Sequence, residues 1–309
     1  MSVAQIVAQF PTYSSVVSPN WLEKESDWIV VYISDRMLWF RELEADLVAL
    51  VKNGVPLQRL ASCYRDSLRN RTEVQKAIYE VHGAAMLSAL ARRTELHVPR
   101  GDGSNRNFDV LVEIDGAIIN ADSKTRKDEF PFNASRIEEK VGAIFGGSRA
   151  TMDPHDAADL GFPVQKGGHG PGHKATPEST VIRQILLDGI GQLPIQGCNL
   201  ILFGQIDGNL DNLIDALFGT EYFEDRRDVT TGKFSGRIVR AKNGAFSGGD
   251  DDQAFRALSG VLWIRLWQDG GALRKTYRGF QNPSALTAVP EKVAIVLKAL
   301  IESSEKESK

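Results

Sequence analysis

The stretch from Asp109 to Lys124, DVLVEIDGAIINADSK, places two carboxylates and a lysine on what reads as a buried β-hairpin. Asp115 and Gly116 between two apolar runs are typical of a two-residue hairpin turn, in which both turn residues take a positive φ. If these two residues form the whole loop, the antiparallel ladder places Asp109 opposite Asp122. Two acids on facing strands are costly to bury unless something binds them.

Opposing side chains in such a ladder share a face, with Cβ atoms about 5 Å apart. Two carboxylates at that separation repel each other, and each disfavours the ionisation of the other. A hard dication removes this cost, because Mg²⁺ binds in proteins to one or two carboxylates together with waters and phosphate oxygens. Lys124 follows Asp122 by two residues and therefore points to the same side of its strand. The hairpin predicts either a metal site beside an ammonium group or a half-exposed face with a plain salt bridge between Asp122 and Lys124.

Other elements must position this hairpin, and hydrophobic periodicity predicts them along the chain. Helices are predicted at residues 35–54, 55–70, 73–93, 135–147, 177–194, 209–219 and 290–304, and further strands at 94–98, 198–207, 258–267 and 273–280. Thr72 and Gln75 have the spacing of a capping box at the start of the third helix, in which His82 is predicted to be a packing residue. Helices flanking a mixed central sheet indicate an α/β fold, with an N-terminal helical segment over 1–70 and a core over 71–309.

The composition is that of a globular protein with a proper core, since 42% of the residues are hydrophobic and 25% are charged. No apolar run approaches the roughly 18 residues that a membrane helix needs, and the first residues lack the basic region of a secretory signal. The two cysteines, Cys63 and Cys198, are far apart and match no metal spacing. We therefore expect a cytoplasmic protein without a membrane partner.

A basic segment lies in the second half of the chain, although the formal net charge of the whole chain is −3. The segment RRDVTTGKFSGRIVRAK contains Arg226, Arg227, Lys233, Arg237, Arg240 and Lys242 and only one acid, Asp228. A local patch of this kind can contact phosphates even when the net charge is negative. A solvated loop followed by an edge strand explains the same residues equally well.

The segment from about 150 to 176 has few signals of regular structure and contains GGHGPGH at its centre. Four glycines in seven residues carry a high ordering cost, which predicts a flexible insertion. His169 and His173 could bind zinc, but no cysteine or second histidine pair supports such a site. A mobile loop is the preferred interpretation, and in a nuclease-like fold it could close over a substrate as a lid.

The acids and the lysine resemble the motif of the PD-(D/E)XK nuclease superfamily, which has the restriction-endonuclease-like fold. That motif has an acid on a helix, an Asp on the following hairpin and (D/E)-x-K on the next strand. Glu80, Asp109 and Asp122-Ser123-Lys124 occupy these places, and the resemblance runs over about residues 72–207. It implies an αβββαβ core. Phe108 replaces the usual proline of the motif, and the acid of the tripeptide is Asp rather than the commoner Glu.

The resemblance implies a Mg²⁺- or Mn²⁺-dependent endonuclease that hydrolyses DNA, of restriction or defence type, acting as a single chain or a homodimer. Asp109, Asp122, Glu80 and the Ser123 carbonyl would hold the metal, while Lys124 would position the attacking water and offset charge on the phosphate. The residues implied in DNA binding are Lys124, Arg126, Arg226, Arg227, Lys233, Arg237 and Arg240.

Two alternatives remain open at this point. Since a fold does not establish a function, the chain could be a nucleic-acid- or protein-binding module that keeps the nuclease-like fold without catalysis. The substrate of an active enzyme could also be RNA, because the motif does not distinguish the two nucleic acids.

Overall fold

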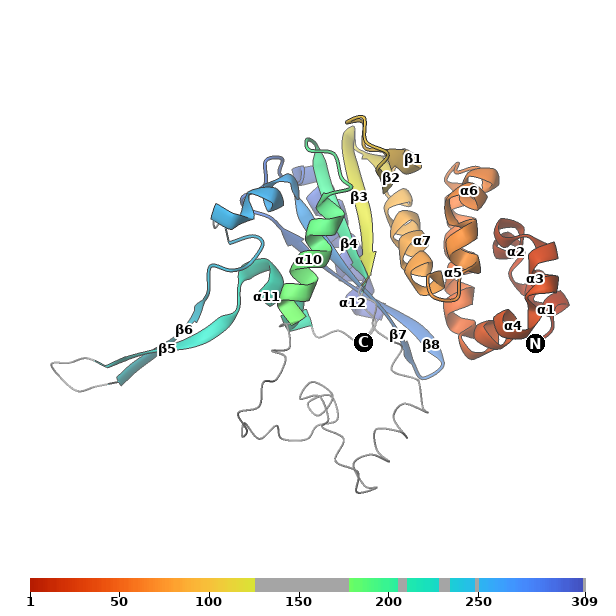
Figure 1. The fold of residues 1–309 in the computed structure, drawn as a ribbon, viewed down its shortest axis with the longest axis horizontal. Helices are drawn as coiled ribbons and strands as arrows, with labels where there is room; N and C mark the ends of the chain where they lie inside the picture. Colours follow the sequence, from red (N-terminus) through yellow and green to blue (C-terminus); the bar gives the residue numbers. More distant parts are fainter. Residues whose placement is uncertain (126–177, 205–209, 228–233, 248–249, 308–309) are drawn as a thin grey trace, which may run out of the picture. The chain divides into compact units, whose positions relative to one another are not determined.

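The computed structural model describes residues 1–125, 178–204, 210–227, 234–247 and 250–307 (Figure 1). The predicted helix at 135–147 and the predicted insertion around 150–176 lie outside the described residues, as do Arg126 and Lys233. Residues 1–127 and 178–309 form one compact unit.

A mixed, open sheet of six strands forms the centre of this unit. In spatial order the strands are β1 (Arg93–Pro99), β2 (Asn107–Ile114), β3 (Ala117–Thr125), β4 (Cys198–Gly204), β7 (Gly260–Asp269) and β8 (Ala272–Gln281). The pairs β1·β2, β2·β3 and β7·β8 are antiparallel, whereas β3·β4 and β4·β7 are parallel. Every residue of β4 is buried, as expected of a central parallel strand. The predicted α/β class with a mixed central sheet is confirmed.

Helices precede and surround the sheet. They are α1 (Val3–Gln9), α2 (Pro11–Val17), α3 (Pro19–Lys24), α4 (Ser26–Asp35), α5 (Met37–Lys52), α6 (Leu57–Arg69), α7 (Val74–Ser88), α10 (Glu178–Ile190), α11 (Leu210–Phe218), the 3₁₀-helix η1 (Asp250–Ala257) and α12 (Glu291–Glu307). The predicted N-terminal helical segment is thus present. The basic segment forms not one edge strand but two antiparallel strands of a separate sheet, β5 (Glu221–Arg227) and β6 (Phe234–Arg240).

Two glycines allow helices to approach opposite faces of the sheet closely (Figure 1). A Cβ at Gly83 of α7 would lie 2.6 Å from Cδ1 of Leu202, and a Cβ at Gly189 of α10 would lie 2.9 Å from Cδ1 of Ile201. Because Ile201 and Leu202 are consecutive on β4, their side chains point to opposite faces. Hence α7 covers one face of the sheet and α10 covers the other.

The start of α7 differs from the prediction. The helix begins at Val74 after Glu73, and no side chain caps its first turn. Asn70 explains the difference, because its Oδ1 accepts hydrogen bonds from both the amide and the hydroxyl of Thr72, at 2.9 and 2.8 Å. An Asx turn of this type competes with a helix cap for the same donors, so the predicted capping box at Thr72 is wrong.

The hairpin of β2 and β3 forms as predicted. Asp115 and Gly116 have φ values of 49° and 81°, as a two-residue hairpin turn requires. The ladder begins at Ile114 paired with Ala117 and continues to Val110 paired with Ala121, which is the predicted register. It ends there, one position before Asp109 and Asp122.

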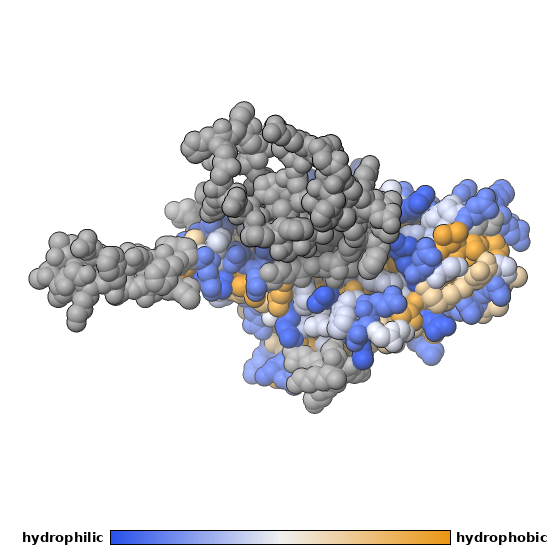
Figure 2. All heavy atoms as spheres, turned by 90° about the horizontal axis from the view of Figure 1, so that it is seen from below, coloured by the Kyte–Doolittle hydropathy of each residue, from blue (hydrophilic) through white to orange (hydrophobic). Residues whose placement is uncertain are grey.

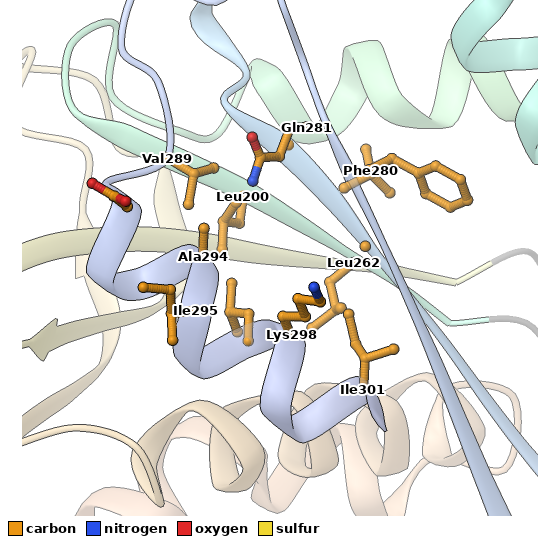
Figure 3. A pocket seen from close by; sticks show the side chains of 14 residues that line it. Leu200, Leu262, Phe280, Gln281, Val289, Ala294, Ile295, Lys298 and Ile301 are labelled. Carbon is orange, nitrogen blue, oxygen red and sulfur yellow. The ribbon is translucent and has the colours of Figure 1, made fainter. Parts of the chain in front are cut away.

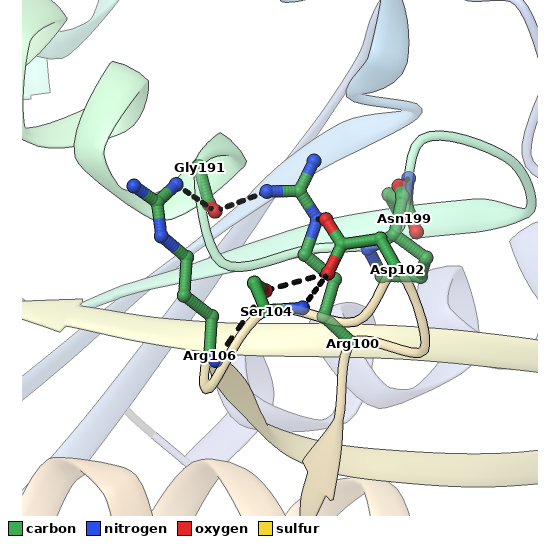
Figure 4. Close-up of polar contacts among 7 residues, drawn as sticks. Arg100, Asp102, Ser104, Arg106, Gly191 and Asn199 are labelled. Atoms are coloured by element: carbon green, nitrogen blue, oxygen red, sulfur yellow. Dashed lines mark hydrogen bonds and ion pairs between the residues drawn. The ribbon is translucent and has the colours of Figure 1, made fainter.

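The loop between β1 and β2 is attached to the end of α10 (Figure 4). Arg100 and Arg106 both donate to the carbonyl of Gly191, at 2.7 and 2.9 Å, and Arg100 also pairs with Asp102. Arginines at a helix C-terminus satisfy carbonyls that have no partner within the helix. Ser104 donates its hydroxyl and amide to Asp102 and completes the loop.

The surface has no single apolar face in the view of Figure 2, where hydrophilic and hydrophobic residues are interspersed over the coloured part. Val31 and Ile295 are examples of exposed aliphatic side chains. Among the helices that the structure describes, none combines the length and the apolar character needed to cross a membrane.

Candidate metal and catalytic site

The sequence-predicted acids come from three elements, and the structure brings two of them together with a histidine. Glu80 lies on α7 and Asp109 on β2, and each offers a carboxylate oxygen within 4.8 Å of the other and of a ring nitrogen of His97 on β1. Three potential ligands from a helix and two strands thus converge. Asp122 lies outside this group, which we call the ligand group (Glu80, His97 and Asp109).

Asp109 is fixed by the backbone of the next strand. Its Oδ2 accepts a hydrogen bond of 2.6 Å from the amide of Ser123. The carboxylate therefore takes a place at the end of the ladder, where the predicted direct pair with Asp122 is not formed. The predicted role of the Ser123 carbonyl is separate from this contact and stays a prediction.

Asp122 and Lys124 form a second pair, which interacts with Asp109 and Glu80 through charge. Lys124 Cε lies 3.3 Å from the position of a Cβ at Gly189, so both side chains belong to the face that α10 covers. The Nζ of Lys124 lies 2.5 Å from Oδ2 of Asp122. The predicted neighbourhood of these two residues is confirmed, and the ion pair is also the contact that a purely structural role would require.

Asp122 is fully buried, at 0% exposure. Its Oδ1 has no hydrogen-bond partner among the described residues. Burial, and then the negative charge of Asp109, raise the pKa of Asp122 to about 8, although Lys124 opposes the shift. Burial therefore disfavours the anion of Asp122 even though the ammonium of Lys124 is paired with it.

Glu80 is 7% exposed, so it is not the solvated helix acid that is the usual alternative. Lys76, one turn earlier, places its Nζ 3.2 Å from Oε1 of Glu80. Burial, followed by the charge of Asp109, raises the pKa of Glu80 to about 7. Burial is thus the larger cause of both raised carboxyl pKa values, and the negative charge of Asp109 adds to each.

His97 is the candidate ligand that the sequence did not reveal. Its φ of 45° is rare for a residue other than glycine, and Arg59 of α6 donates to the carbonyls of Leu96 and His97. The Tyr64 ring packs edge-on against the imidazole, with centroids 5.3 Å apart. Burial lowers the pKa of His97, which favours the neutral ring. Its Nε2 is buried without a hydrogen-bond partner in the described part of the chain.

A second histidine cluster, the His82 cluster, lies on α7 as well. It consists of Glu42, Asp46, His82, Lys275 and Tyr277. The Nδ1 atom of His82 lies 2.8 Å from Oδ2 of Asp46, and its Nε2 atom lies 2.9 Å from the hydroxyl of Tyr277. Lys275 forms an ion pair with Glu42. His82 is thus a buried packing residue with both ring nitrogens bonded, as predicted.

The predicted DNA-binding residues are only partly described. Arg226 and Arg227 end β5, and Arg237 and Arg240 lie on β6, where Arg237 is paired with Glu224 in the ladder. The Arg240 side chain donates to the carbonyl of Gly219 at 3.1 Å and forms ion pairs with Asp215 and Glu221. The charge of Arg240 is therefore already balanced by acids of its own chain.

An apolar pocket of about 340 Å³ lies between α12 and the strands β4, β7 and β8 (Figure 3). Its lining includes Leu200, Leu262, Phe280, Ile295 and Ile301, with Lys298 as a charged member. None of the ligand group lines it, and neither do Asp122 and Lys124. The acidic site and the apolar pocket are therefore separate features.

Comparison with known proteins adds no family: no protein-family model, curated protein or solved structure matches this chain. The chemistry of the site therefore rests on its own donors. Carboxylate oxygens suit Mg²⁺ and Mn²⁺, and a neutral imidazole suits transition-metal dications. The Oδ1 of Asp122 and the Nε2 of His97 are buried and lack hydrogen-bond partners within the described ranges. The residues present fit a divalent cation.

Proposed function

We propose that the chain is a divalent-metal-dependent endonuclease that hydrolyses DNA phosphodiester bonds, of restriction or defence type. The observation that carries the proposal is the convergence of Glu80, His97 and Asp109 beside the buried pair of Asp122 and Lys124. The order α7, β1, β2, β3, α10, β4 supports it, because an αβββαβ core is what the resemblance to the PD-(D/E)XK superfamily implies.

The ligand group would hold Mg²⁺ or Mn²⁺, and Asp122, which lies outside the group, would act on the site through its charge. When bound, such an ion supplies Lewis acidity, which neutralises charge on a phosphate and makes water a better nucleophile at neutral pH. The Ser123 amide keeps Asp109 oriented through the 2.6 Å hydrogen bond. Glu80 is oriented by its helix and by Lys76.

Lys124 would act on the phosphate rather than on the metal. Its side chain is 11% exposed, and the ion pair with Asp122 holds the ammonium in one place. A fixed charge in a site that excludes water interacts more strongly with developing negative charge than the same charge in solvent. Lys124 would thus stabilise the charge that grows on the phosphate oxygens and orient the attacking water.

One observation favours the second candidate, a nucleic-acid- or protein-binding module without catalysis. Asp122 and Lys124 neutralise each other at 2.5 Å, so this part of the site would be stable with no ion and no substrate. In that case the two residues serve as a structural salt bridge, and the protein binds its partner by surfaces elsewhere.

Cleavage assays test the proposal. Wild-type protein and Asp109→Asn are incubated with supercoiled plasmid, single-stranded DNA and RNA, each with Mg²⁺, Mn²⁺ or EDTA. We expect wild type to cut DNA only with a divalent ion and the variant to be inactive. Cutting of RNA alone would show that the substrate is RNA and not DNA. Intact substrates throughout, together with gel-shift binding of any of them, would favour the binding module.

A further inference from the structure

His97 is brought to the acids by an irregular point in an edge strand. The pairs Leu96 with Val110 and Val98 with Phe108 place His97 opposite Asp109, although these two residues are themselves missing from the ladder. The positive φ of His97 interrupts the regular strand. A strained conformation of a residue other than glycine costs about 1–3 kcal/mol and persists only where the surroundings enforce it.

The surroundings do enforce it. Arg59 of α6 donates hydrogen bonds to the carbonyl before His97, that of Leu96, and to the carbonyl of His97 itself. Tyr64, also of α6, packs its ring against the imidazole. Packing alone would account for a buried histidine whose polar atoms are satisfied. It does not account for Nε2, which is buried and has no hydrogen-bond partner among the residues described.

Two carboxylates lie close to this ring. A ring nitrogen of His97 and oxygens of Glu80 and Asp109 lie within 4.8 Å of one another, yet the ring forms no hydrogen bond or ion pair with either acid in the described structure. One imidazole nitrogen and two carboxylates thus converge without forming hydrogen bonds to one another. Ligands around a single metal ion are arranged in this way.

We propose that His97 is a nitrogen ligand of this site and makes it select first-row transition dications, with Mn²⁺ as the probe, over Mg²⁺. The inference rests on the proposed metal site and specifies its ion. Mg²⁺ is a hard ion that takes oxygen ligands almost exclusively, whereas imidazole binds transition-metal dications well. A set of two carboxylates and one imidazole therefore strengthens the binding of transition dications more than that of Mg²⁺.

Binding measurements without any substrate test this selectivity. Mn²⁺ and Mg²⁺ are titrated calorimetrically into the full chain, as wild type, His97→Gln and His82→Gln. Since losing even an outer partner of a ligand costs about 10- to 100-fold in affinity, His97→Gln should weaken Mn²⁺ binding at least about tenfold. Mg²⁺ binding should change little. His82→Gln is the matched control, because it removes the other described histidine that lies near two carboxylates.

Electron spin-echo spectroscopy of bound Mn²⁺ gives a second, direct reading. A coordinated imidazole produces a nitrogen coupling, which we expect in wild type and in His82→Gln but not in His97→Gln. Circular dichroism shows which variants are folded and can be interpreted. Should His97→Gln not fold, the wild-type and His82→Gln spectra still decide the question, because the coupling must be present in both.

The outcomes separate the two proposals. Mn²⁺ bound without nitrogen coupling, or equal affinities for Mn²⁺ and Mg²⁺ in wild type, would overturn the role of His97 and leave the metal-dependent nuclease intact. A coupling that disappears with His82→Gln would assign the ion to the His82 cluster and also overturn it. Absence of any divalent binding would remove the basis of both proposals.

Discussion

The ligand group and the His82 cluster contain the same kinds of residues. They differ in whether the polar groups within each cluster have hydrogen-bond partners. Glu80 and His82 are two residues apart on α7, so their side chains leave the helix about 200° apart and enter different surroundings. In the His82 cluster each ring nitrogen has a partner, and Glu42 is paired with Lys275. In the ligand group, Nε2 of His97 has no partner among the described residues.

This difference separates a structural network from a binding site. A buried polar network stabilises a fold when every member is satisfied, and an incomplete one costs free energy. In the ligand group, Lys76 lies beside Glu80 and the amide of Ser123 donates to Asp109. Despite Lys76, burial and the charge of Asp109 keep the pKa of Glu80 raised to about 7. A dication would provide the partner that Nε2 of His97 lacks among the described residues.

The largest expected effect is the difference in cleavage rate between Lys124→Ala and Lys275→Ala. Lys124→Ala should lower the rate of DNA cleavage by at least about 10²- to 10³-fold, because a fixed charge that stabilises the transition state is lost. Lys275→Ala should leave cleavage unchanged, since its partner is Glu42 in the His82 cluster. Single-turnover cleavage at saturating Mn²⁺ measures both. Full cleavage by Lys124→Ala would contradict the proposed mechanism.

The pH dependence of stability is expected to come from Glu80 of the ligand group and from Asp122. The pKa values of Asp122 and Glu80 are raised to about 8 and about 7 in the folded chain, so above about pH 4 the folded chain holds protons that the unfolded chain has released. With EDTA, the free energy of unfolding should fall between about pH 5 and pH 8, on the order of 1 kcal/mol per pH unit.

Urea unfolding over this pH range measures the slope, and Mn²⁺ at saturating concentration should flatten it. Asp46→Asn, in the His82 cluster, should keep the slope of wild type. A slope of the opposite sign in EDTA would show that the carboxylates of the site are stabilised as anions and need no cation.

A matched pair of Asp→Asn substitutions compares stability directly. Asp46→Asn replaces a charged acceptor of the His82 ring by a neutral one, and we expect a loss of about 1–2 kcal/mol, because hydrogen bonds to charged groups contribute about 1.5–3 kcal/mol. Asp109→Asn should leave stability in EDTA unchanged or raise it, since it removes a charge that repels Asp122 and Glu80. Thermal melts in EDTA decide, and equal destabilisation by both variants would remove the distinction between the regions.

The smallest expected effect is that of Tyr277→Phe. It removes the hydroxyl that lies 2.9 Å from Nε2 of His82, at a cost of about 1 kcal/mol for one hydrogen bond. Mn²⁺ affinity and cleavage should both stay at the wild-type value. A drop in Mn²⁺ affinity with this variant would show that the His82 cluster, and not the ligand group, holds the ion.

The sequence predicted the hairpin because its signals are local. Asp115 and Gly116 define the turn, the turn defines the register, and the register brings Asp109 near the strand that carries Asp122 and Lys124. Period-two alternation also placed Lys124 beside Asp122 correctly. Glu80 could be placed on its helix, although only the packing of α7 on the sheet shows that it is buried.

His97 could not be predicted in the same way. A long, irregular loop joins β1 to β2, so no turn type fixes the register between His97 and Asp109. The positive φ of His97 also depends on Arg59, which comes from a distant helix. The error at Thr72 has a related cause, because Asn70 captured the donors that a capping box would use. Each failure arises where a contact made on folding overrides a local pattern.

The position of β1 at the edge of the sheet has a consequence for local unfolding. An edge strand is paired on one side only, so its amides are expected to exchange with solvent through openings far smaller than global unfolding. An ion shared by Glu80, His97 and Asp109 would join this strand to α7 and to β2. Hydrogen exchange of β1 would then slow on ion binding more than that of the central strand β4, and an edge strand of the sheet would report whether the site is filled.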